Sequence, residues 1–247
     1  MKRSSAIWRA AGLLWLLACS SAQAGEIRSL SELAMLPPYC KGTQLIRQLS
    51  NDPVPIDQYK EIYGKSFMHL HHYCWALNAE NKANAMFNKR DRDSELGSAI
   101  SDIKYVLTNA DPDFVLLPDI YNSQARILFS LHRDPEAVLS LEKAIELKPG
   151  FVPAVARLSD YFVSIGDKGK AIQTLKNGID NTENADFLIG KLAKLGVTYQ
   201  GTPGSAIKKE DKKDEAILPV VSEPPPAASS VPAVTQPANN PYCRFCP

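Results

Sequence analysis

Apolar residues recur at helical spacing through the middle of this chain. Between about Ile56 and Leu195 they return every three or four positions, and no stretch alternates apolar and polar residues as a half-buried strand does. The pattern predicts an all-α fold for the 56–195 segment. The two ends of the chain follow different patterns.

Segment 1–24 has the three parts of a secretory signal. Three basic residues (Lys2, Arg3 and Arg9) precede an apolar run, and the segment ends in the small-residue sequence 22–24. The sequence therefore predicts a secreted or periplasmic protein, cleaved after Ala24. The apolar run is too short to span a bilayer, and no later segment is longer, so no transmembrane helix is expected.

A second hypothesis for the amino-terminal segment is a lipoprotein signal. Residues 16–19, Leu-Leu-Ala-Cys, are similar to the sequence in which the cysteine is lipidated and becomes the new terminus. In that case Cys19 would anchor the protein to a membrane.

An internal repeat is the strongest signal in the helical region. Residues from Pro118 onward are matched in kind by residues from Val152 onward. Other antiparallel helical bundles also combine small and large residues, but the shared period favours a repeat. The matching pairs are Ala125 and Ser159, Leu128 and Phe162, Ala137 and Ala171, Leu141 and Leu175, and Ala144 and Gly178.

The period and the residue types resemble the tetratricopeptide repeat. Segments 135–138 and 144–149 are similar to the second helix and closing proline of that family, and Gly166 with Asp167 is similar to its turn. The second copy departs from the family at its end, where Glu183 replaces the proline. The resemblance implies a short α-solenoid of antiparallel helical hairpins.

Two repeats cannot bury all of their own apolar surface, so the sequence predicts further helices on both sides. Upstream, 67–86 and 96–107 are expected to form a degenerate hairpin around a polar loop that contains Lys89, Arg90 and Arg92. The expected segments are a signal peptide (1–24), an extended N-terminal arm (25–55), the degenerate hairpin (56–112), two repeats (118–151 and 152–184), a capping helix (185–200) and a disordered proline-rich tail ending in CxxC (201–247).

The tetratricopeptide resemblance also implies a binding groove, lined by the first helix of each hairpin. The arginines and the aspartate at position 160 are expected to meet charged groups of a protein partner. An ordinary surface salt bridge between Arg126 and Asp160 is the alternative. The predicted groove residues are Asp119, Asn122, Arg126, Phe129, Arg157 and Asp160.

Charge argues against nucleic acid and membrane surfaces as partners. The net charge is +1, and removal of the three basic signal residues lowers it to −2. A nucleic-acid-binding protein or a polybasic membrane anchor would carry a marked excess of basic residues. The expected partner is therefore a protein or a peptide.

Cleavage after Ala24 leaves four cysteines in a compartment where disulfides persist. Cys40 and Cys74 are the pair within the expected folded part, and a disulfide between them would pin the N-terminal arm to the first hairpin. Two free buried thiols are the alternative. Cys243 and Cys246 form a CxxC pair at the end of the tail, where a local disulfide or mixed disulfides with a partner are expected.

Three of the four histidines lie beside Cys74, at positions 69, 71 and 72. On a helix, Cys74 is expected to face the core, whereas His71 is expected to point away from it together with Trp75 and Asn78. A metal site would need His69, His72 and ligands from elsewhere, so a packing role is favoured and no metal is predicted.

The sequence contains no pattern typical of an enzyme. It has no nucleophile beside a base, no phosphate-binding glycine loop and no paired carboxylates in a recognisable motif, and no cofactor is expected. The leading hypothesis is an exported protein-binding scaffold or assembly factor. The alternative is a redox or metal-handling protein that uses the C-terminal CxxC, with the repeats as a docking module.

Overall fold

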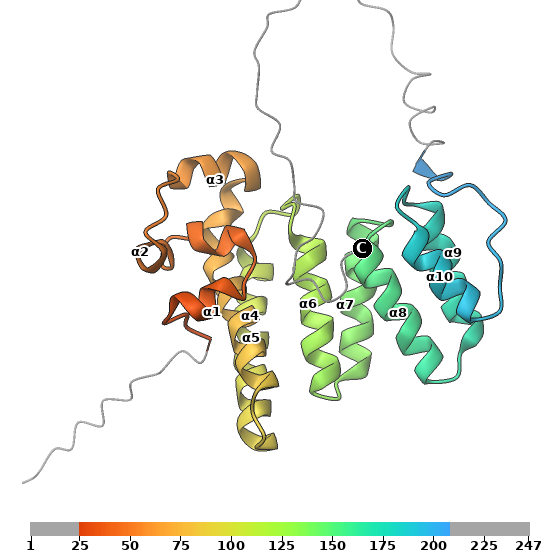
Figure 1. The fold of residues 1–247 in the computed structure, drawn as a ribbon, viewed down its shortest axis with the longest axis horizontal. Helices are drawn as coiled ribbons and strands as arrows, with labels where there is room; N and C mark the ends of the chain where they lie inside the picture. Colours follow the sequence, from red (N-terminus) through yellow and green to blue (C-terminus); the bar gives the residue numbers. More distant parts are fainter. Residues whose placement is uncertain (1–24, 208–247) are drawn as a thin grey trace, which may run out of the picture.

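The computed structural model describes residues 25–207, which form helices and loops without strands (Figure 1). The predicted all-α fold is confirmed for this part of the chain. The predicted signal peptide, residues 208–247 of the predicted tail, and Cys243 and Cys246 lie outside the described residues.

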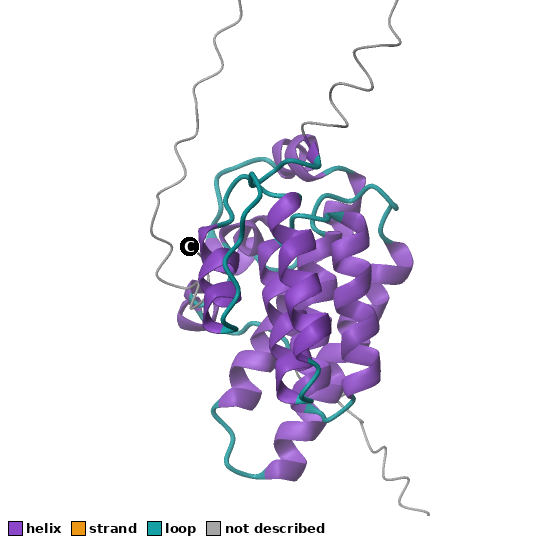
Figure 2. Cartoon of the chain, turned by 90° about the vertical axis from the view of Figure 1, so that its right-hand side faces the viewer, coloured by secondary structure: helices purple, strands orange, loops and turns teal. Residues whose placement is uncertain are grey.

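Three antiparallel hairpins and one further helix form the body of the described chain, side by side in chain order (Figures 1 and 2). Each hairpin packs most closely within itself and then against the next one. The helices are α4 (Leu70–Asn84) with α5 (Lys89–Asn109), α6 (Leu117–Ser130) with α7 (Asp134–Leu147), α8 (Val152–Ser164) with α9 (Lys168–Asp180), and α10 (Asp186–Lys194), which packs on α8 and α9.

The sequence repeat corresponds to equivalent packing in the second and third hairpins. Ala137 and Ala171 are fully buried at the start of the second helices, and Leu141 and Leu175 fill the next turn of the same helices. Small residues let the two helices of a hairpin approach closely, and large ones fill the remaining space. The matches found in the sequence are therefore matches between core positions.

The turns of these two hairpins also share one backbone conformation. His132 (φ 57°) and Gly166 (φ 81°) both adopt the left-handed region, and they occupy equivalent positions in the two repeats. Glycine adopts this region at no steric cost, and histidine is one of the few other residue types that are found there more often than average. The repeat thus extends to the geometry of the connecting turn.

The first hairpin begins its second helix earlier than the sequence suggested. The segment around Lys89, Arg90 and Arg92 was expected to be a loop, but it forms the first turn of α5. The Asn88 side chain caps this helix by accepting a hydrogen bond from the Arg90 N–H at 2.9 Å. α5 is 21 residues long and continues through Gly97 to Asn109.

Residues 25–55, which the sequence predicted to be an extended arm, contain three short helical segments, and two more follow before the first hairpin. Ser29 accepts a hydrogen bond from the Glu32 N–H at 3.2 Å and so caps the first short helix, and Pro38 opens the next. The elements are α1 (Leu30–Ala34), η1 (Pro38–Gly42), α2 (Arg47–Ser50), α3 (Ile56–Tyr63) and η2 (Lys65–His69).

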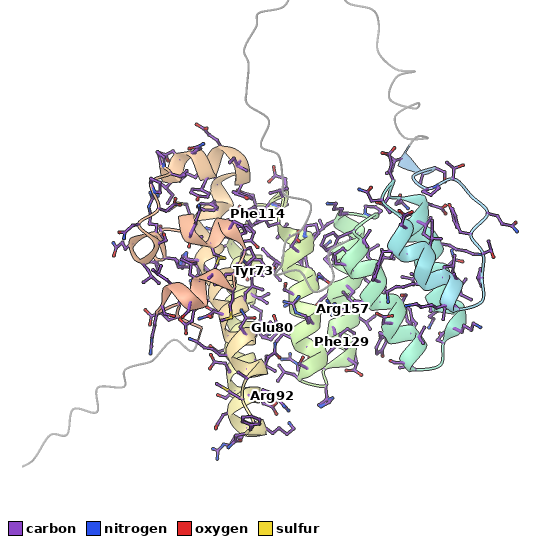
Figure 3. All side chains as sticks on the ribbon, in the orientation of Figure 1. Tyr73, Glu80, Arg92, Phe114, Phe129 and Arg157 are labelled. Carbon is purple, nitrogen blue, oxygen red and sulfur yellow. A yellow bond between two sulfur atoms is a disulfide. The ribbon has the colours of Figure 1, made fainter. Side chains whose placement is uncertain are left out.

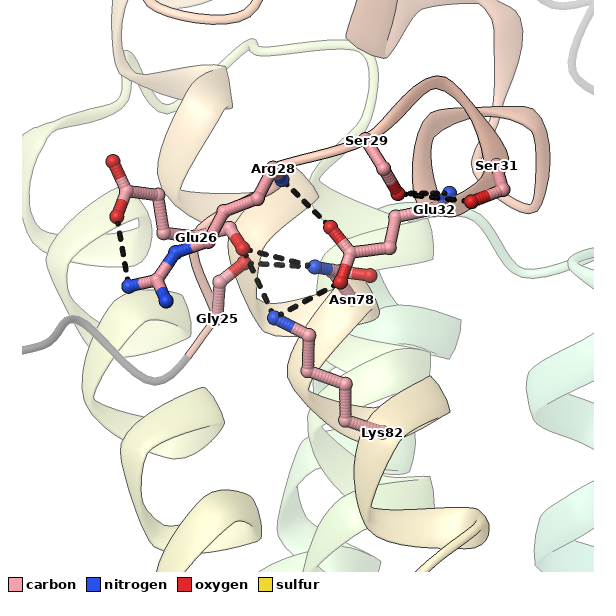
Figure 4. A network of polar contacts seen from close by, with 8 residues as sticks. All are labelled: Gly25, Glu26, Arg28, Ser29, Ser31, Glu32, Asn78 and Lys82. Atoms are coloured by element: carbon pink, nitrogen blue, oxygen red, sulfur yellow. Dashed lines mark hydrogen bonds and ion pairs between the residues drawn. The ribbon is translucent and has the colours of Figure 1, made fainter.

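Residues 25–32 cover one face of α4 through polar contacts (Figure 4). The Asn78 amide donates to the carbonyl oxygens of Gly25 and Glu26, at 3.2 and 3.3 Å. Lys82 donates to the Glu26 carbonyl at 3.0 Å and pairs with Glu32 at 3.4 Å. The first turn of the described chain thereby closes the open end of the helical stack.

A disulfide between Cys40 and Cys74 joins η1 to α4, as the sequence predicted. Both cysteines are fully buried, and Cys74 faces the core. Next to them, the rings of Tyr59 and Phe67 stack with centroids 5.0 Å apart, and Tyr63 stacks on Phe67 at 5.7 Å. The N-terminal segment therefore has an apolar core that is continuous with the first hairpin.

At the other end, α10 covers the last hairpin with Leu188 and Leu192, both fully buried. Gly196 (φ 76°) ends this region in the left-handed conformation typical of a helix C-terminus. Residues 201–207 return to α9, where the Gly204 N–H donates to the Ile179 carbonyl and the Ala206 N–H to the Asp180 carbonyl. The start of the predicted tail is thus packed on the stack.

Between residues 25 and 207, no helix combines the length and the apolar character that crossing a bilayer requires.

A close approach of α8 and α9 at Gly178 yields a stability prediction. A Cβ atom at Gly178 would lie 2.5 Å from the Val155 Cγ1, so Gly178→Ala overpacks this contact at a cost of about 1 to 3 kcal/mol. Gly190→Ala in the exposed middle of α10 is the control, because a Cβ there meets only open space. Both variants gain the same helix propensity, about 1 kcal/mol.

Urea denaturation of the two variants measures the difference. We expect Gly178→Ala to be less stable than Gly190→Ala by about 1 to 3 kcal/mol, the overpacking cost alone. Equal stabilities would show that α8 and α9 separate without cost.

The disulfide yields a second prediction. It closes a loop of sequence separation 34, so Cys40→Ala/Cys74→Ala should lower the free energy of unfolding by about 3 to 4 kcal/mol. Chemical denaturation measures the loss, with Cys243→Ala/Cys246→Ala as the control that leaves the loop closed. Alkylation of Cys40 and Cys74 in unfolded but unreduced protein would contradict the bridge.

Candidate functional site

The first helices of the three hairpins, α4, α6 and α8, form one surface together with α10, and we call it the first-helix face (Figure 1). Polar side chains cross each boundary between these helices. The Tyr73 hydroxyl lies 2.8 Å from the Ser123 hydroxyl, between α4 and α6 (Figure 3). This face holds the residues that the sequence placed in a groove.

Arg126 of α6 is bound by Glu80 of α4 and not by Asp160. Its Nε and one terminal nitrogen each donate to a different carboxylate oxygen of Glu80, both at 2.5 Å. The Glu80 side chain is 8% exposed, so the pair is largely desolvated, and a bidentate contact of this kind satisfies both groups. The proposed surface salt bridge between Arg126 and Asp160 is therefore wrong.

Arg157 of α8 lacks such a partner. Its Nε donates to the Asn122 Oδ1 at 3.2 Å, and it forms no ion pair with any carboxylate between residues 25 and 207. Burial, together with the neighbouring positive charge of Arg126, lowers the pKa of Arg157 to about 10. The charges of Glu80 and Asp160 act on this guanidinium from a distance, but neither carboxylate makes an ion pair with it.

Asp160 pairs with α10 through Lys191. The Lys191 ammonium lies 2.6 Å from an Asp160 carboxylate oxygen and 5.4 Å from the centre of the Phe187 ring. The Asp160 side chain is 65% exposed, so this contact adds little stability. It does fix the position of Lys191 at the boundary between α8 and α10.

A pocket of about 620 Å³ lies between α8 and α10 on this face, and we call it the α8–α10 pocket. Its walls combine apolar side chains with Arg157, Asp160, Lys191 and Lys194. Lys194 is exposed and has no ion-pair partner in the described part of the chain. The apolar wall residues used below are Val163, Phe187 and Leu195.

The other predicted groove residues lie along α6, outside the pocket. Phe129 packs on Tyr161 of α8, with ring centroids 5.3 Å apart (Figure 3). Asp119 lies near the N-terminal end of α6, where burial raises its pKa. Burial raises the pKa of Tyr39 as well, and Tyr73 and Asp119 add to that effect. The N-terminal segment therefore closes this end of the face.

Sequence reasoning missed four residues of the site: Glu80, Phe187, Lys191 and Lys194. Two of them were accessible from the repeat, because Lys191 follows Arg157, and Lys194 follows Asp160, by one further repeat period. One more step along the repeat would have placed both lysines on the groove-lining helix. Glu80 gave no such signal, since it stands outside the period relative to Arg126.

The histidines form a packed cluster between α4 and α5. His72 Nδ1 lies 2.7 Å from the Asp102 carboxylate, and its ring lies 3.9 Å from the Tyr105 ring. His69 Nδ1 lies 3.3 Å from the Tyr105 hydroxyl. Among the described residues no three His, Cys, Asp or Glu side chains are grouped to hold a metal ion.

His71 was expected to point away from the core, but it is buried. It shares its side of α4 with Trp75 and Asn78, and Gly25 and Glu26 pack on these two residues. Burial, with a smaller contribution from His72, lowers the pKa of His71 to about 4. The sequence correctly placed His71 on the same side of the helix as Trp75 and Asn78. It did not predict that the N-terminal segment packs on that side.

Comparison with family models, with curated proteins and with solved structures gives no match to this chain.

The buried His71 predicts a pH dependence of stability. Its pKa is about 4 in the folded state and about 6.5 in an unfolded chain, so the unfolded state binds the proton between these values. The contribution of His71 to stability is therefore complete above pH 6.5 and falls by about 1.4 kcal/mol per unit as the pH decreases towards 4.

Urea denaturation between pH 7 and 4.5 tests this contribution. His71→Gln should show a shallower loss of stability than the native chain over this range. His132→Asn is the control, because His132 is exposed in a turn whose positive φ asparagine tolerates. Identical slopes for the native chain and His71→Gln would contradict the prediction.

Proposed function

We propose that this protein is an exported scaffold that binds an extended segment of another protein on its first-helix face. The resemblance to the tetratricopeptide repeat motivates the proposal, and the shared core positions and turn conformations of the second and third hairpins support it. Repeats of this kind bind partners along a continuous face because each unit adds one strip of surface.

Export is supported by the disulfide as well as by the amino-terminal sequence. Bridges such as that between Cys40 and Cys74 persist in oxidising compartments and are rare in the cytosol. In such a compartment the bridge would remain intact and hold the N-terminal segment on the helical stack.

Arg157, which lines the α8–α10 pocket without an ion-pair partner among residues 25–207, carries the proposal. A half-buried guanidinium that makes no ion pair is a favourable place for an anionic group of a partner, because such a group would regain the charge pairing that burial has taken from water. The apolar wall and Lys194 complete the description of the ligand: an extended segment with aliphatic side chains and at least one carboxylate.

Photo-crosslinking tests the site in the native compartment. A photoreactive amino acid at Val163, in the pocket, should capture a partner, whereas one at Leu139 on α7 should not. Both side chains are exposed, at 45% and 64%, so neither substitution disturbs the core. Arg126→Glu is avoided because it would break the buried pair with Glu80.

The chemistry of the captured segment then decides the outcome. The crosslinked segment is identified by mass spectrometry and synthesised with its carboxylates intact or changed to amides. We expect the amide form to bind about tenfold more weakly, and Lys194→Glu to weaken binding of the carboxylate form by a similar factor. Equal capture from Leu139, or affinity independent of the carboxylates, would refute the proposal.

A further inference from the structure

We infer that the α8–α10 pocket is occupied, in the free protein, by residues 214–223 of the same chain. The inference rests on the proposed function, because it treats the pocket as a site for an extended segment. It goes further by naming the first occupant, which a partner must displace.

Charge favours this segment. Arg157, Lys191 and Lys194 line the pocket with Asp160 as the single carboxylate among its wall residues, which leaves two positive charges in excess. Residues 214–223 contain three acidic residues and no lysine or arginine. The residues immediately before them, 208–213, are by contrast mostly lysine. The acidic residues of the tail can therefore face the positive charges of the pocket only if it is segment 214–223, and not segment 208–213, that lies in the pocket.

The apolar residues of the segment match the pocket wall in kind. Ile217, Leu218, Val220 and Val221 form the longest aliphatic run of the chain after residue 207, and the acidic residues flank it on both sides. Aliphatic side chains in a pocket lined by Val163, Phe187 and Leu195 would bury apolar surface that is otherwise in water. The later run 231–234 has no acidic neighbour.

The chain between Ile207 and Asp214 is long enough to reach the α8–α10 pocket. The Ala206 N–H donates to the Asp180 carbonyl at 2.9 Å, so the described chain ends beside the C-terminus of α9, which packs on both α8 and α10. Seven residue steps from Ile207 to Asp214 span up to about 23 Å. The 13-residue helix α8, which forms one wall of the pocket, is about 20 Å long.

Occupation by a tethered segment lowers the apparent affinity for any competing ligand. A short tether gives an effective concentration of about 1 mM at the pocket. If the segment itself binds the pocket with an intrinsic dissociation constant of tens of micromolar, a competing ligand binds at least tenfold more weakly to the native chain than to a chain whose own segment cannot bind.

Competition with a labelled peptide tests the inference. The probe is a fluorescein-labelled peptide of residues 212–224, and its binding to the full exported chain, 25–247, is followed by fluorescence anisotropy. The test variant carries Ile217→Ser, Leu218→Ser, Val220→Ser and Val221→Ser. We expect it to bind the probe at least tenfold more tightly than the native chain does. The control variant is Val231→Ser/Val234→Ser, which should match the native chain.

Two further measurements identify the site. Lys194→Glu, added to the test variant, should remove at least tenfold of the gained affinity, and a probe with its three acidic residues changed to amides should bind at least tenfold more weakly. Equal affinity of the native chain and the test variant would overturn the inference, as would a gain that persists with Lys194→Glu. A native chain whose probe affinity increases on dilution would show pairing between copies and would also overturn it.

Failure of this inference can be distinguished from failure of the proposed function. If a partner is captured at Val163 but the native chain and the test variant bind the probe equally, the protein binds a partner and residues 214–223 do not occupy the pocket. Tight probe binding by the test variant without capture of any partner makes the pocket a self-binding site and removes the scaffold function.

Discussion

A stack of helical hairpins buries apolar surface only between neighbours, so each end of the stack needs a cover. In this chain the N-terminal cover is built from short helices that have little stability alone. The disulfide between Cys40 and Cys74 and the hydrogen bonds from Asn78 hold that cover on α4. The helices beyond it can then present a continuous face, because the first hairpin is fixed.

Along that face the charges become progressively less balanced towards the C-terminal end. Glu80 fully engages Arg126 near the first hairpin, where burial demands a partner for each charge. One hairpin later Arg157 has only the amide of Asn122, and on α10 Lys194 has no acidic partner in the described chain. The stack thus combines a self-sufficient N-terminal half with a C-terminal half that is cationic and partly apolar.

The repeat explains which parts of the structure could be predicted from sequence. Ala137 and Ala171 report the close approach of paired helices, so the second and third hairpins follow from the repeat period. The partner of Arg126 does not follow, because the first hairpin departs from the period. The burial of His71 also escaped prediction, because a helical phase gives the direction of a side chain but does not say which segment packs on that side of the helix.

The lack of an ion pair at Arg157 among residues 25–207 has a practical consequence for the folded protein as a whole. Any anionic ligand that reaches this guanidinium binds the folded state and not the unfolded one, so it raises the temperature at which the stack melts. Buffer ions such as phosphate and sulfate would act in the same direction. Occupancy of the α8–α10 pocket is therefore accessible as a shift in melting temperature, without any knowledge of what the natural ligand is.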